Sequence, residues 1–368
     1  MNILIISHFT WPHQSPRAFR TAELSEELAR LGHDVTVYSV PEGADYVAYT
    51  QKTGVKIMPI YMRIPSNKGG ADYRNNAIDK ALYHVFNTLT DYPSIEFKWR
   101  TKDILEKEKD FDLLITIAVP HEIHFGAGAA MERRPSEPTK CWIADCGDPF
   151  MFNPYKKPFF WFAGEEKRWC RRVDYITVPT EQSINGYYPE FRSKIKVIPQ
   201  GFNFDDINIA EYEPNSVPTF AYTGRFYPGL RDPYQFLDYL TTLKEDFRCI
   251  FFVASDLPQK YTDALGDKLV VKKGWKRKDI IYELSKMDFL LNIPNKGSMV
   301  QVPSKLIDYA LAKRPVLSIE TDFAQQQQLH EFLQGDYSSQ MTLPDLEMYN
   351  IKNVARQFLA LAEEKLKG

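Results

Sequence analysis

The chain has 368 residues, of which 44% are hydrophobic and 26% are charged. At roughly 150 residues per domain, this length predicts about two domains, each large enough to bury its own core. The composition excludes a disordered tail, a collagen-like chain and a small disulfide-stapled scaffold. Because 46 Lys and Arg residues nearly balance 48 Asp and Glu residues, no global positive field exists to hold nucleic acid or an anionic bilayer. We therefore expect no nucleic-acid partner, and any anionic ligand must be held locally.

The cysteines and the apolar runs bear on the cellular compartment. None of the four cysteines has CxxC spacing, which favours free thiols in a reducing compartment over disulfides or a zinc site. The apolar run at residues 3–6 is interrupted by His8 and Pro12, so it is too short for a signal peptide. No later run approaches the roughly 18 residues that a membrane-spanning helix needs. The sequence predicts a cytoplasmic protein with free thiols at Cys141, Cys146, Cys170 and Cys249.

The start of the chain predicts one βαβ unit. Residues 2–7 are a short run rich in branched apolar side chains, as expected of a buried strand. A loop follows, and residues 17–31 predict a helix with its leucines on one face. Gly32 suits the left-handed conformation that ends a helix, and residues 34–40 predict the next strand.

The same alternation continues to the end of the chain and predicts an α/β protein with two doubly wound domains. We assign residues 1–200 to the first domain, 201–350 to the second and 351–368 to a C-terminal helix that packs back toward the first. Because ligands of such sheets collect at the carboxyl ends of the strands, we expect the site in a cleft between the domains. Strands are predicted at residues 56–60, 113–119, 141–145, 175–179, 196–199, 219–223, 249–254, 269–272, 289–293 and 316–319. Helices are predicted at residues 233–245, 278–286 and 353–366.

Residues 301–310 are the strongest candidate for a phosphate site. Pro303 suits the first turn of a helix, and the helix would begin at the carboxyl end of a buried strand. Free amides and the positive dipole end at Ser304 bind phosphate, and Lys305 adds a cation. Asp308 lies one turn later, where it could hold ribose hydroxyls. The alternative is an ordinary amphipathic helix with solvated charges.

A second candidate follows the first strand of the second domain. Gly224 lets the backbone turn sharply, and Arg225 and Arg231 can hold neighbouring phosphates in bidentate fashion. A diphosphate leaving group gains charge as its bond to a sugar breaks, so cations placed there lower the barrier by a few kcal/mol. Either arginine alone could equally be an ordinary surface residue, but the pair together with the helix start favours a site.

Several segments, in order and spacing, resemble the large fourth family of retaining glycosyltransferases with the GT-B fold. The likeness runs over nearly the whole chain and includes a segment that is similar to the family's interdomain hinge. It implies two Rossmann-like domains that face each other across a cleft. It also implies hexosyl transfer from a nucleoside diphosphate sugar with retention of configuration, without metal or cofactor. The segments are residues 3–6, 22–37, 142–149, 174–180 and 195–202.

The resemblance assigns roles on the donor side. Arg225 and Arg231 match the basic pair that holds the donor diphosphate, although the second is usually lysine. Asp308 matches the second acid of a paired-acid motif and would bind the ribose, but the position of the first acid holds Val300. We therefore expect Asn295, Ser298 or loop amides to bind the sugar hydroxyls. Gly274 and Trp275 resemble the segment that flanks the nucleobase, mostly through backbone atoms.

The loop after the first strand would face the acceptor. Family members commonly have glycines there, whereas this loop carries His8 and leads into Arg17 and Arg20. This favours cationic side chains that face a phosphate-bearing donor or acceptor. Arg20 could equally be a solvated helix residue.

Polar residues also follow two later strands of the first domain. His121 could donate to a sugar hydroxyl, and the family often has a histidine in the sugar pocket; with His124 it also has metal-ligand spacing, but no third ligand is near. Asp145 and Asp148 could bind acceptor hydroxyls, or Asp148 could act as the base that takes the acceptor proton. A simple turn at Asp148 is the alternative.

Two further segments have competing interpretations. Asp110 and Asp112 match a metal-binding DxD pattern, but they precede a strand and would lie away from the cleft, so a surface turn is the better interpretation. Residues 150–162 interleave aromatics with lysines and could rest in a membrane interface or be buried by the next helix; we favour burial.

The sequence thus favours a cytoplasmic glycosyltransferase that takes a nucleotide sugar and a saccharide or lipid-linked acceptor. Peripheral contact with the inner face of a membrane stays open. Two alternatives share the fold: a sugar-nucleotide epimerase, and a catalytically silent nucleotide-sugar-binding subunit, which the missing acid at Val300 favours.

Overall fold

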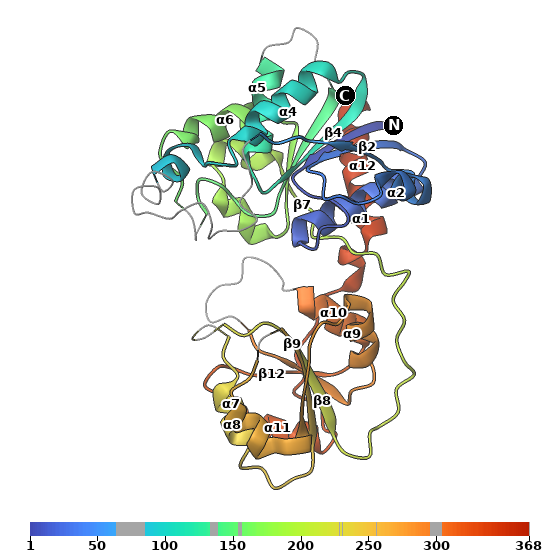
Figure 1. Ribbon diagram of the computed structural model, residues 1–368, viewed down its shortest axis with the longest axis vertical. Helices are drawn as coiled ribbons and strands as arrows, with labels where there is room; N and C mark the ends of the chain where they lie inside the picture. Colours follow the sequence, from blue (N-terminus) through green and yellow to red (C-terminus); the bar gives the residue numbers. More distant parts are fainter. Residues whose placement is uncertain are drawn as a thin grey trace. The chain divides into compact units, whose positions relative to one another are not determined.

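A computed structural model describes residues 1–63, 85–132, 139–153, 157–227, 229, 231–254, 256–294 and 304–367. The chain divides into two compact units. Unit 1 comprises Met1–Asn203 and Met348–Gly368, and unit 2 comprises Phe204–Glu347. In the described part of the chain, the strands form one seven-stranded and one five-stranded sheet, and all the strand pairs are parallel (Figure 1). The predicted α/β class with two doubly wound sheets is confirmed.

The sheet of unit 1 has the strand order β3-β2-β1-β4-β5-β6-β7. Parallel neighbours require crossover connections, and helices provide most of them. The order reverses between β1 and β4, so the carboxyl ends of these two strands flank a topological switch point. The strands are β1 (Asn2–Ser7), β2 (Asp34–Ser39), β3 (Lys56–Pro59), β4 (Phe111–Ala118), β5 (Thr139–Cys146), β6 (Tyr175–Val178) and β7 (Ile195–Val197).

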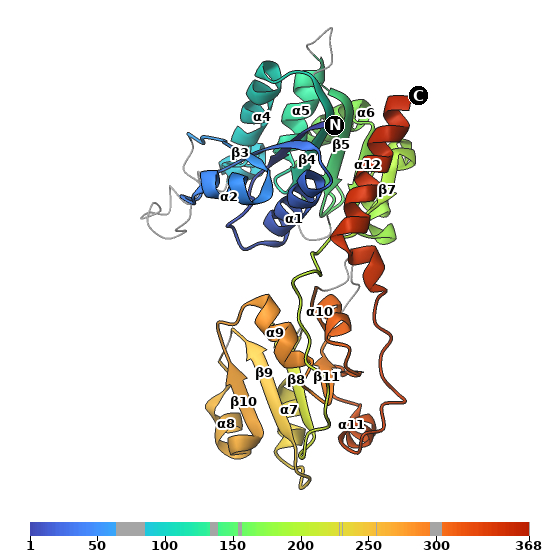
Figure 2. The ribbon, with the colours of Figure 1, turned by 90° about the vertical axis from the view of Figure 1, so that its right-hand side faces the viewer.

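Helices cover both faces of this sheet. Leu24 and Leu28 of α1 share one apolar cluster with α2 and α12, whereas Phe97 of α4 and Trp169 of α6 belong to the cluster on the other face. In Figure 2, α1 and α12 lie side by side in front of the sheet. The helices are α1 (Pro16–Arg30), α2 (Tyr46–Thr53), α4 (Glu96–Lys107), α5 (Glu122–Glu132), α6 (Phe162–Arg172) and α12 (Ile351–Lys367).

The C-terminal helix α12 is anchored in unit 1 beside the point where the chain leaves that unit. The Phe202 amide donates to the Tyr349 carbonyl at 2.8 Å, and the Ile351 amide donates to the Phe202 carbonyl at 3.0 Å. A Cβ atom on Gly201 would lie 2.6 Å from Cδ1 of Ile351, so a larger residue there would force the Ile351 side chain or the helix to move. The outgoing and returning segments are therefore tied together.

Unit 2 repeats the doubly wound plan with the strand order β10-β9-β8-β11-β12. Its switch point lies between β8 and β11. One face is covered by α7, α8 and α11, and the other by α9 and α10 (Figure 1). The strands are β8 (Thr219–Gly224), β9 (Arg248–Val253), β10 (Leu269–Lys272), β11 (Phe289–Asn292) and β12 (Val316–Ser318). The helices are α7 (Tyr234–Leu240), α8 (Gln259–Leu265), α9 (Arg277–Leu284), α10 (Ser304–Ala312) and α11 (Gln326–Leu333).

Each predicted strand is present, with ends that differ by a residue or two. Gly32 has φ +88°, which confirms the predicted left-handed helix end. The helix predicted at residues 233–245 is wrong in its second half, because α7 ends at Leu240. The Thr241 and Thr242 hydroxyls both donate to preceding backbone carbonyls at 2.7 Å, a local alternative to continued helix.

Two predictions about single residues are also tested by the fold. All four cysteines are free, as predicted, and all four are buried. Asp112 accepts the Asn2 amide at 2.9 Å and pairs with Lys140 at 2.7 Å, which confirms that it lies at the amino end of the strands. Among the residues that the structure describes, no helix is both long enough and apolar enough to cross a membrane.

The aromatic segment at residues 150–162 is only partly buried, so the prediction of burial holds for some of its residues. Phe150 and Phe162 lie in the core, at 5% and 4% exposure. Phe160 and Trp161 are 75% and 42% exposed. The segment therefore presents aromatic rings to solvent on unit 1, while residues 154–156 lie outside the described part.

Candidate active site

The candidate donor site lies where β8 and β11 separate. Within the described residues, these strands pair only at Phe220 with Phe289 and at Ala221 with Leu290. Beyond this point the two strands continue toward their carboxyl ends without further pairing between them. Ligands of open parallel sheets bind outside the carboxyl ends of the strands at such a switch point, and we call this position between β8 and β11 the donor crevice.

Lys305 reaches into this crevice from the first turn of α10. Its Nζ atom donates to the Ile293 carbonyl at 2.9 Å and lies 5.0 Å from the ring centre of Tyr222. The residue is only 7% exposed. Burial, with the nearby positive charge of Arg231, lowers the pKa of Lys305 to about 7. The sequence predicted an accessible cation here; the fold instead holds the ammonium group almost out of water.

Arg231 is held near Lys305 by a short two-stranded turn. The Tyr227 amide donates to the Arg231 carbonyl at 3.0 Å, and the Arg231 amide returns a bond to the Tyr227 carbonyl at 2.8 Å. Nη1 of Arg231 contacts the Arg225 carbonyl at 3.5 Å. Its Nε atom is buried and has no hydrogen-bond partner among the described residues. This N–H donor of Arg231 is therefore unsatisfied within the described part of the chain.

Gly224 and Arg225 form the turn at the end of β8. Gly224 has φ +141°, and a Cβ atom there would lie 3.0 Å from the Tyr222 hydroxyl, so glycine is required on two grounds. The Tyr222 hydroxyl donates to the Arg225 carbonyl at 3.3 Å. The Arg225 side chain is exposed. The backbone of this turn is therefore fixed, while its guanidinium group lies in solvent.

Asp308 forms an ion pair that the sequence did not predict. Nε and Nη2 of Arg277 both donate to Oδ1 of Asp308, at 2.8 and 2.5 Å. Burial raises the pKa of Asp308, and Arg277 opposes this shift. Arg277 stands two residues after Trp275, at the first turn of a helix that begins after a strand. That position is the signal that could have identified it.

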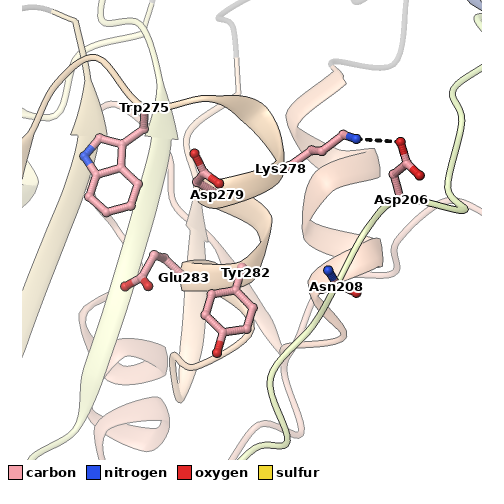
Figure 3. Close-up of a pocket in the computed structure, with 7 residues that line it drawn as sticks. All are labelled: Asp206, Asn208, Trp275, Lys278, Asp279, Tyr282 and Glu283. Carbon is pink, nitrogen blue, oxygen red and sulfur yellow. Dashed lines mark hydrogen bonds and ion pairs between the residues drawn. The ribbon is translucent and has the colours of Figure 1, made fainter. Parts of the chain in front are cut away.

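Trp275 borders an open hollow of about 490 Å³ on α9 (Figure 3). It is 40% exposed, with Nζ of Lys272 4.8 Å from its ring. Lys278 pairs with Asp206 at 2.7 Å across the hollow. Of the predicted donor-binding residues whose side chains the structure describes, only Trp275 lines it. The other lining residues are Asp206, Asn208, Lys278, Asp279, Tyr282 and Glu283.

Three predicted donor-binding positions receive no test from the structure. Asn295 and Ser298 lie outside the described residues. Val300, which occupies the position of the missing acid, also lies outside them. Ser304 begins α10, but its side chain is not described. What unit 2 does bring together is Arg231, Lys305 and the Gly224 turn.

On unit 1, Asp145 is the centre of a buried ion-pair network. Arg20 donates to both carboxylate oxygens, at 2.9 and 3.2 Å, and the Thr177 hydroxyl adds a bond at 2.7 Å. Nη2 of Arg17 also binds the Asp145 carboxylate. Burial alone would raise the pKa of Asp145, but Arg20 and Arg17 hold it well below its ordinary value. The carboxylate is therefore charged at any physiological pH.

This network corrects the acceptor-side prediction for Arg20 and Asp145. Arg20 is 1% exposed, donates to the Pro199 carbonyl at 2.8 Å and lies 4.9 Å from the ring of Phe358. Asp145 is 2% exposed. Both side chains are engaged inside unit 1, because each charge neutralises the other. They position Arg17 and the end of β5, and neither faces an acceptor.

Arg17 is the accessible member of this group. Its side chain is 22% exposed, and its Nε atom has no hydrogen-bond partner among the described residues. A Cβ atom on Gly147 would lie 3.2 Å from Cδ of Arg17, so the glycine leaves room for the arginine. Gly147 was not among the predicted site residues, although a glycine directly after a buried strand is a usable signal.

His121 and Asp148 lie together near Arg17. Nε2 of His121 is 3.0 Å from the Asp148 carbonyl, so this nitrogen carries the proton and donates. Burial raises the pKa of the Asp148 carboxyl, and Arg17 opposes the shift. The structure therefore gathers three of the predicted acceptor-side residues at the carboxyl ends of β4 and β5.

The other two histidines that the sequence singled out, His124 and His8, have packing contacts. His124 is fully buried, with Nδ1 2.8 Å from the Thr116 hydroxyl and Nε2 3.3 Å from Sγ of Cys146. Burial lowers the pKa of His124 well below 6.5, so it is neutral. The ring of His8 stacks on the ring of Phe9, with 3.6 Å between the ring centres. Within the described ranges, no three His, Cys, Asp or Glu side chains are arranged to hold a metal ion.

Comparison with known proteins identifies the architecture. No family model matches the sequence, and no curated protein matches it. Solved structures match along the whole chain. A glycosyltransferase from Rickettsia africae ESF-5 is 14% identical, with a TM-score of 0.62 over 100% of this chain and 99% of that one. The chain has the GT-B fold.

Two further GT-B structures support this conclusion. The apo form of the lipopolysaccharide outer core galactosyltransferase WaaB is 12% identical, with a TM-score of 0.62 over 99% of this chain and 100% of that one. Anabaena HepE in complex with UDP is 11% identical, with a TM-score of 0.57 over 100% of this chain and 99% of that one. At these identities the likeness establishes the GT-B fold, and the chemistry must be argued from the site.

Proposed function

We propose that the protein is a retaining hexosyl-type glycosyltransferase. It moves a sugar from a nucleoside diphosphate donor to an acceptor hydroxyl, in the synthesis of a polysaccharide or glycoconjugate. The observation that carries the proposal is the meeting of Arg231 and Lys305 around Tyr222, at the switch point of unit 2. A buried lysine beside an arginine is stabilised by a bound anion, and the GT-B fold offers a diphosphate.

The donor side can stabilise the leaving group without metal. As the bond to the sugar breaks, charge develops on the diphosphate, and fixed cations lower the barrier most where little water screens them. Arg231 and Lys305 supply this charge from within the crevice, and Arg225 supplies it from the exposed turn. Asp308 keeps Oδ2 for the ribose hydroxyls while Arg277 binds Oδ1. The Gly224 turn lets the backbone approach the phosphates.

The acceptor side supplies a cation, a histidine and a carboxylate. Asp148, whose pKa is raised, suits a general base for the acceptor hydroxyl, because a base is most effective when its pKa lies near the working pH. His121 fixes the backbone of Asp148. Arg17 favours an acceptor that carries phosphate, such as a lipid-linked saccharide. In that case, peripheral membrane contact is part of the proposal.

The choice of nucleotide is the first thing to test. Because the HepE structure contains UDP, we propose uridine diphosphate sugars first, followed by the GDP and ADP series. Release of nucleoside diphosphate with a sugar panel, and NMR of the product's anomeric centre, tests transfer with retention. Interconversion of free nucleotide sugars supports an epimerase instead. Saturable binding without turnover supports a silent subunit.

The arginine pair gives a sharper test. Replacing Arg225 or Arg231 by alanine is expected to lower kcat/KM for the donor at least roughly tenfold. Each substitution removes a positive charge that would stabilise the diphosphate leaving group. Arg248→Ala is the matched control, since Arg248 is exposed at the amino end of β9 in the same unit. Unchanged turnover in both site variants would remove these arginines from the site.

A further inference from the structure

The hydroxyl group of Tyr309 lies between β8 and β11 where their pairing stops. Tyr309 belongs to α10 and is fully buried. Its hydroxyl accepts the Thr223 amide of β8 at 3.0 Å and donates to the Leu291 carbonyl of β11 at 2.8 Å. One side-chain group therefore satisfies a backbone donor on one strand and a backbone acceptor on the next.

This contact takes the place of the main-chain ladder. The last paired residues are Ala221 and Leu290, and Thr223 and Leu291 lie directly beyond them. On its other side, Thr223 stays in register with Phe252 of β9. The inserted hydroxyl thus separates β8 from β11 without leaving a buried backbone group unpaired.

One helical turn before Tyr309, the side chain of Lys305 also donates to a backbone carbonyl at the end of β11. Residues four apart lie on one face of a helix, so Lys305 and Tyr309 both project toward β11. Nζ of Lys305 donates to the Ile293 carbonyl at 2.9 Å. Carbonyls two residues apart point to the same edge of a strand, so α10 binds two successive acceptors, at Leu291 and Ile293, along the edge that faces β8.

We propose that Tyr309 is a positioning residue that holds the donor crevice open. Its hydroxyl keeps the end of β8, with the Gly224 turn, apart from the end of β11, so that a diphosphate fits between the turn and the start of α10. This inference rests on the proposed function, and it adds a residue that the sequence analysis did not single out.

Removal of the hydroxyl has a defined structural consequence. In Tyr309→Phe, the Thr223 amide and the Leu291 carbonyl lose their shared partner in a buried place. The two strands can satisfy both groups by pairing with each other, which extends the ladder and narrows the crevice. The ring itself stays packed against Ala221 and Leu290, so the core is retained.

The test compares Tyr309→Phe with Tyr261→Phe in the full chain. Tyr261 is also buried in unit 2, and its hydroxyl donates to the Tyr234 carbonyl at 3.4 Å on the opposite face of the sheet. Calorimetry with UDP, GDP and ADP measures Kd, NMR titration measures the Kd of the matching nucleoside, and thermal unfolding measures stability. We expect Tyr309→Phe to weaken diphosphate binding about tenfold while the nucleoside Kd stays unchanged.

The outcomes separate the inference from the proposed function. Equal diphosphate affinity in wild type and Tyr309→Phe would overturn the inference, as would an equal loss in Tyr261→Phe. If the wild type binds none of the three diphosphates, the proposed function fails. In that case a crystal structure of Tyr309→Phe decides: a direct Thr223 to Leu291 hydrogen bond supports the inference, and strands that stay apart contradict it.

Discussion

Lys305 is placed where its charge depends on what binds beside it. The ammonium group is buried against Tyr222 and near Arg231, so its pKa falls to about 7 and the free protein at neutral pH holds a mixture of charged and neutral forms. A diphosphate in the crevice brings negative charge, which favours the charged form and raises the pKa again. Binding of the donor is therefore linked to uptake of a proton.

This linkage can be measured. At about pH 8 we expect UDP binding to take up close to one proton in the wild type, because Lys305 is mostly neutral before binding and charged after it. Calorimetry in two buffers with different ionisation enthalpies gives the number of protons. Lys305→Met should bind more weakly and take up none, whereas Lys260→Met, at an exposed lysine on α8, should match the wild type. Identical proton uptake in wild type and Lys305→Met would contradict this assignment.

The same lysine affects stability with a definite sign. In the unfolded chain lysine keeps its proton up to about pH 10.5, whereas Lys305 in the fold loses it near pH 7. Between these values the unfolded state binds more protons, so the contribution of Lys305 to the free energy of unfolding rises with pH. That pH dependence is absent from the methionine variant.

At the residue scale, the sequence allows Arg231 and Lys305 to be placed near each other, but not Arg20 and Asp145. Arg231 follows β8, and Lys305 lies in the first turn of the helix after β11. Because β8 and β11 are neighbours in the sheet, the strand order alone brings the two residues together. Arg20 and Asp145 are 125 positions apart, and nothing local indicates that they pair in the interior. Tyr309 was missed for the same reason, because its role depends on partners from other elements.

At the element scale, strands were predictable because parallel strands are covered on both faces and leave continuous runs of branched apolar residues. Helix ends were less predictable, because side-chain hydrogen bonds such as those of Thr241 and Thr242 determine where a helix stops. The sequence predicted that α12 packs toward unit 1, but not which residues make the contact. The contact depends on Gly201, whose importance appears only when Ile351 and Val354 are packed against it.

Substitution of Gly201 tests this attachment. In Gly201→Ala the new Cβ would lie 2.6 Å from Cδ1 of Ile351 and 3.2 Å from Cβ of Val354, so the Ile351 side chain or α12 itself must shift. We expect a loss of about 1–3 kcal/mol in the free energy of unfolding, measured by urea denaturation. Gly164→Ala is the control, because a Cβ there meets nothing within 4 Å and alanine favours the helix. Equal stability of both variants would show that the contact relaxes freely.

At the scale of the whole molecule, the near balance of charge limits how the protein can meet a membrane. The net charge is −2, so bulk electrostatics gives no attraction to an anionic bilayer. Exposed aromatic rings could instead bind the protein to a membrane through hydrophobic contact. Phe160 is 75% exposed, and its ring centre lies 5.4 Å from that of Trp161. Such rings partition into the interfacial region of a bilayer.

If the acceptor is lipid-linked, Phe160 should contribute to membrane contact. Burial of a phenylalanine side chain is worth about 1.5–3 kcal/mol, so Phe160→Ser should lower the vesicle partition coefficient about tenfold or more. Co-sedimentation with phosphatidylglycerol and phosphatidylcholine vesicles measures this, and the loss should persist at high salt because it is hydrophobic. Tyr61→Ser is the control, since Tyr61 is 72% exposed elsewhere on unit 1. Equal sedimentation of all three proteins would exclude Phe160 as a membrane contact and favour a soluble saccharide acceptor.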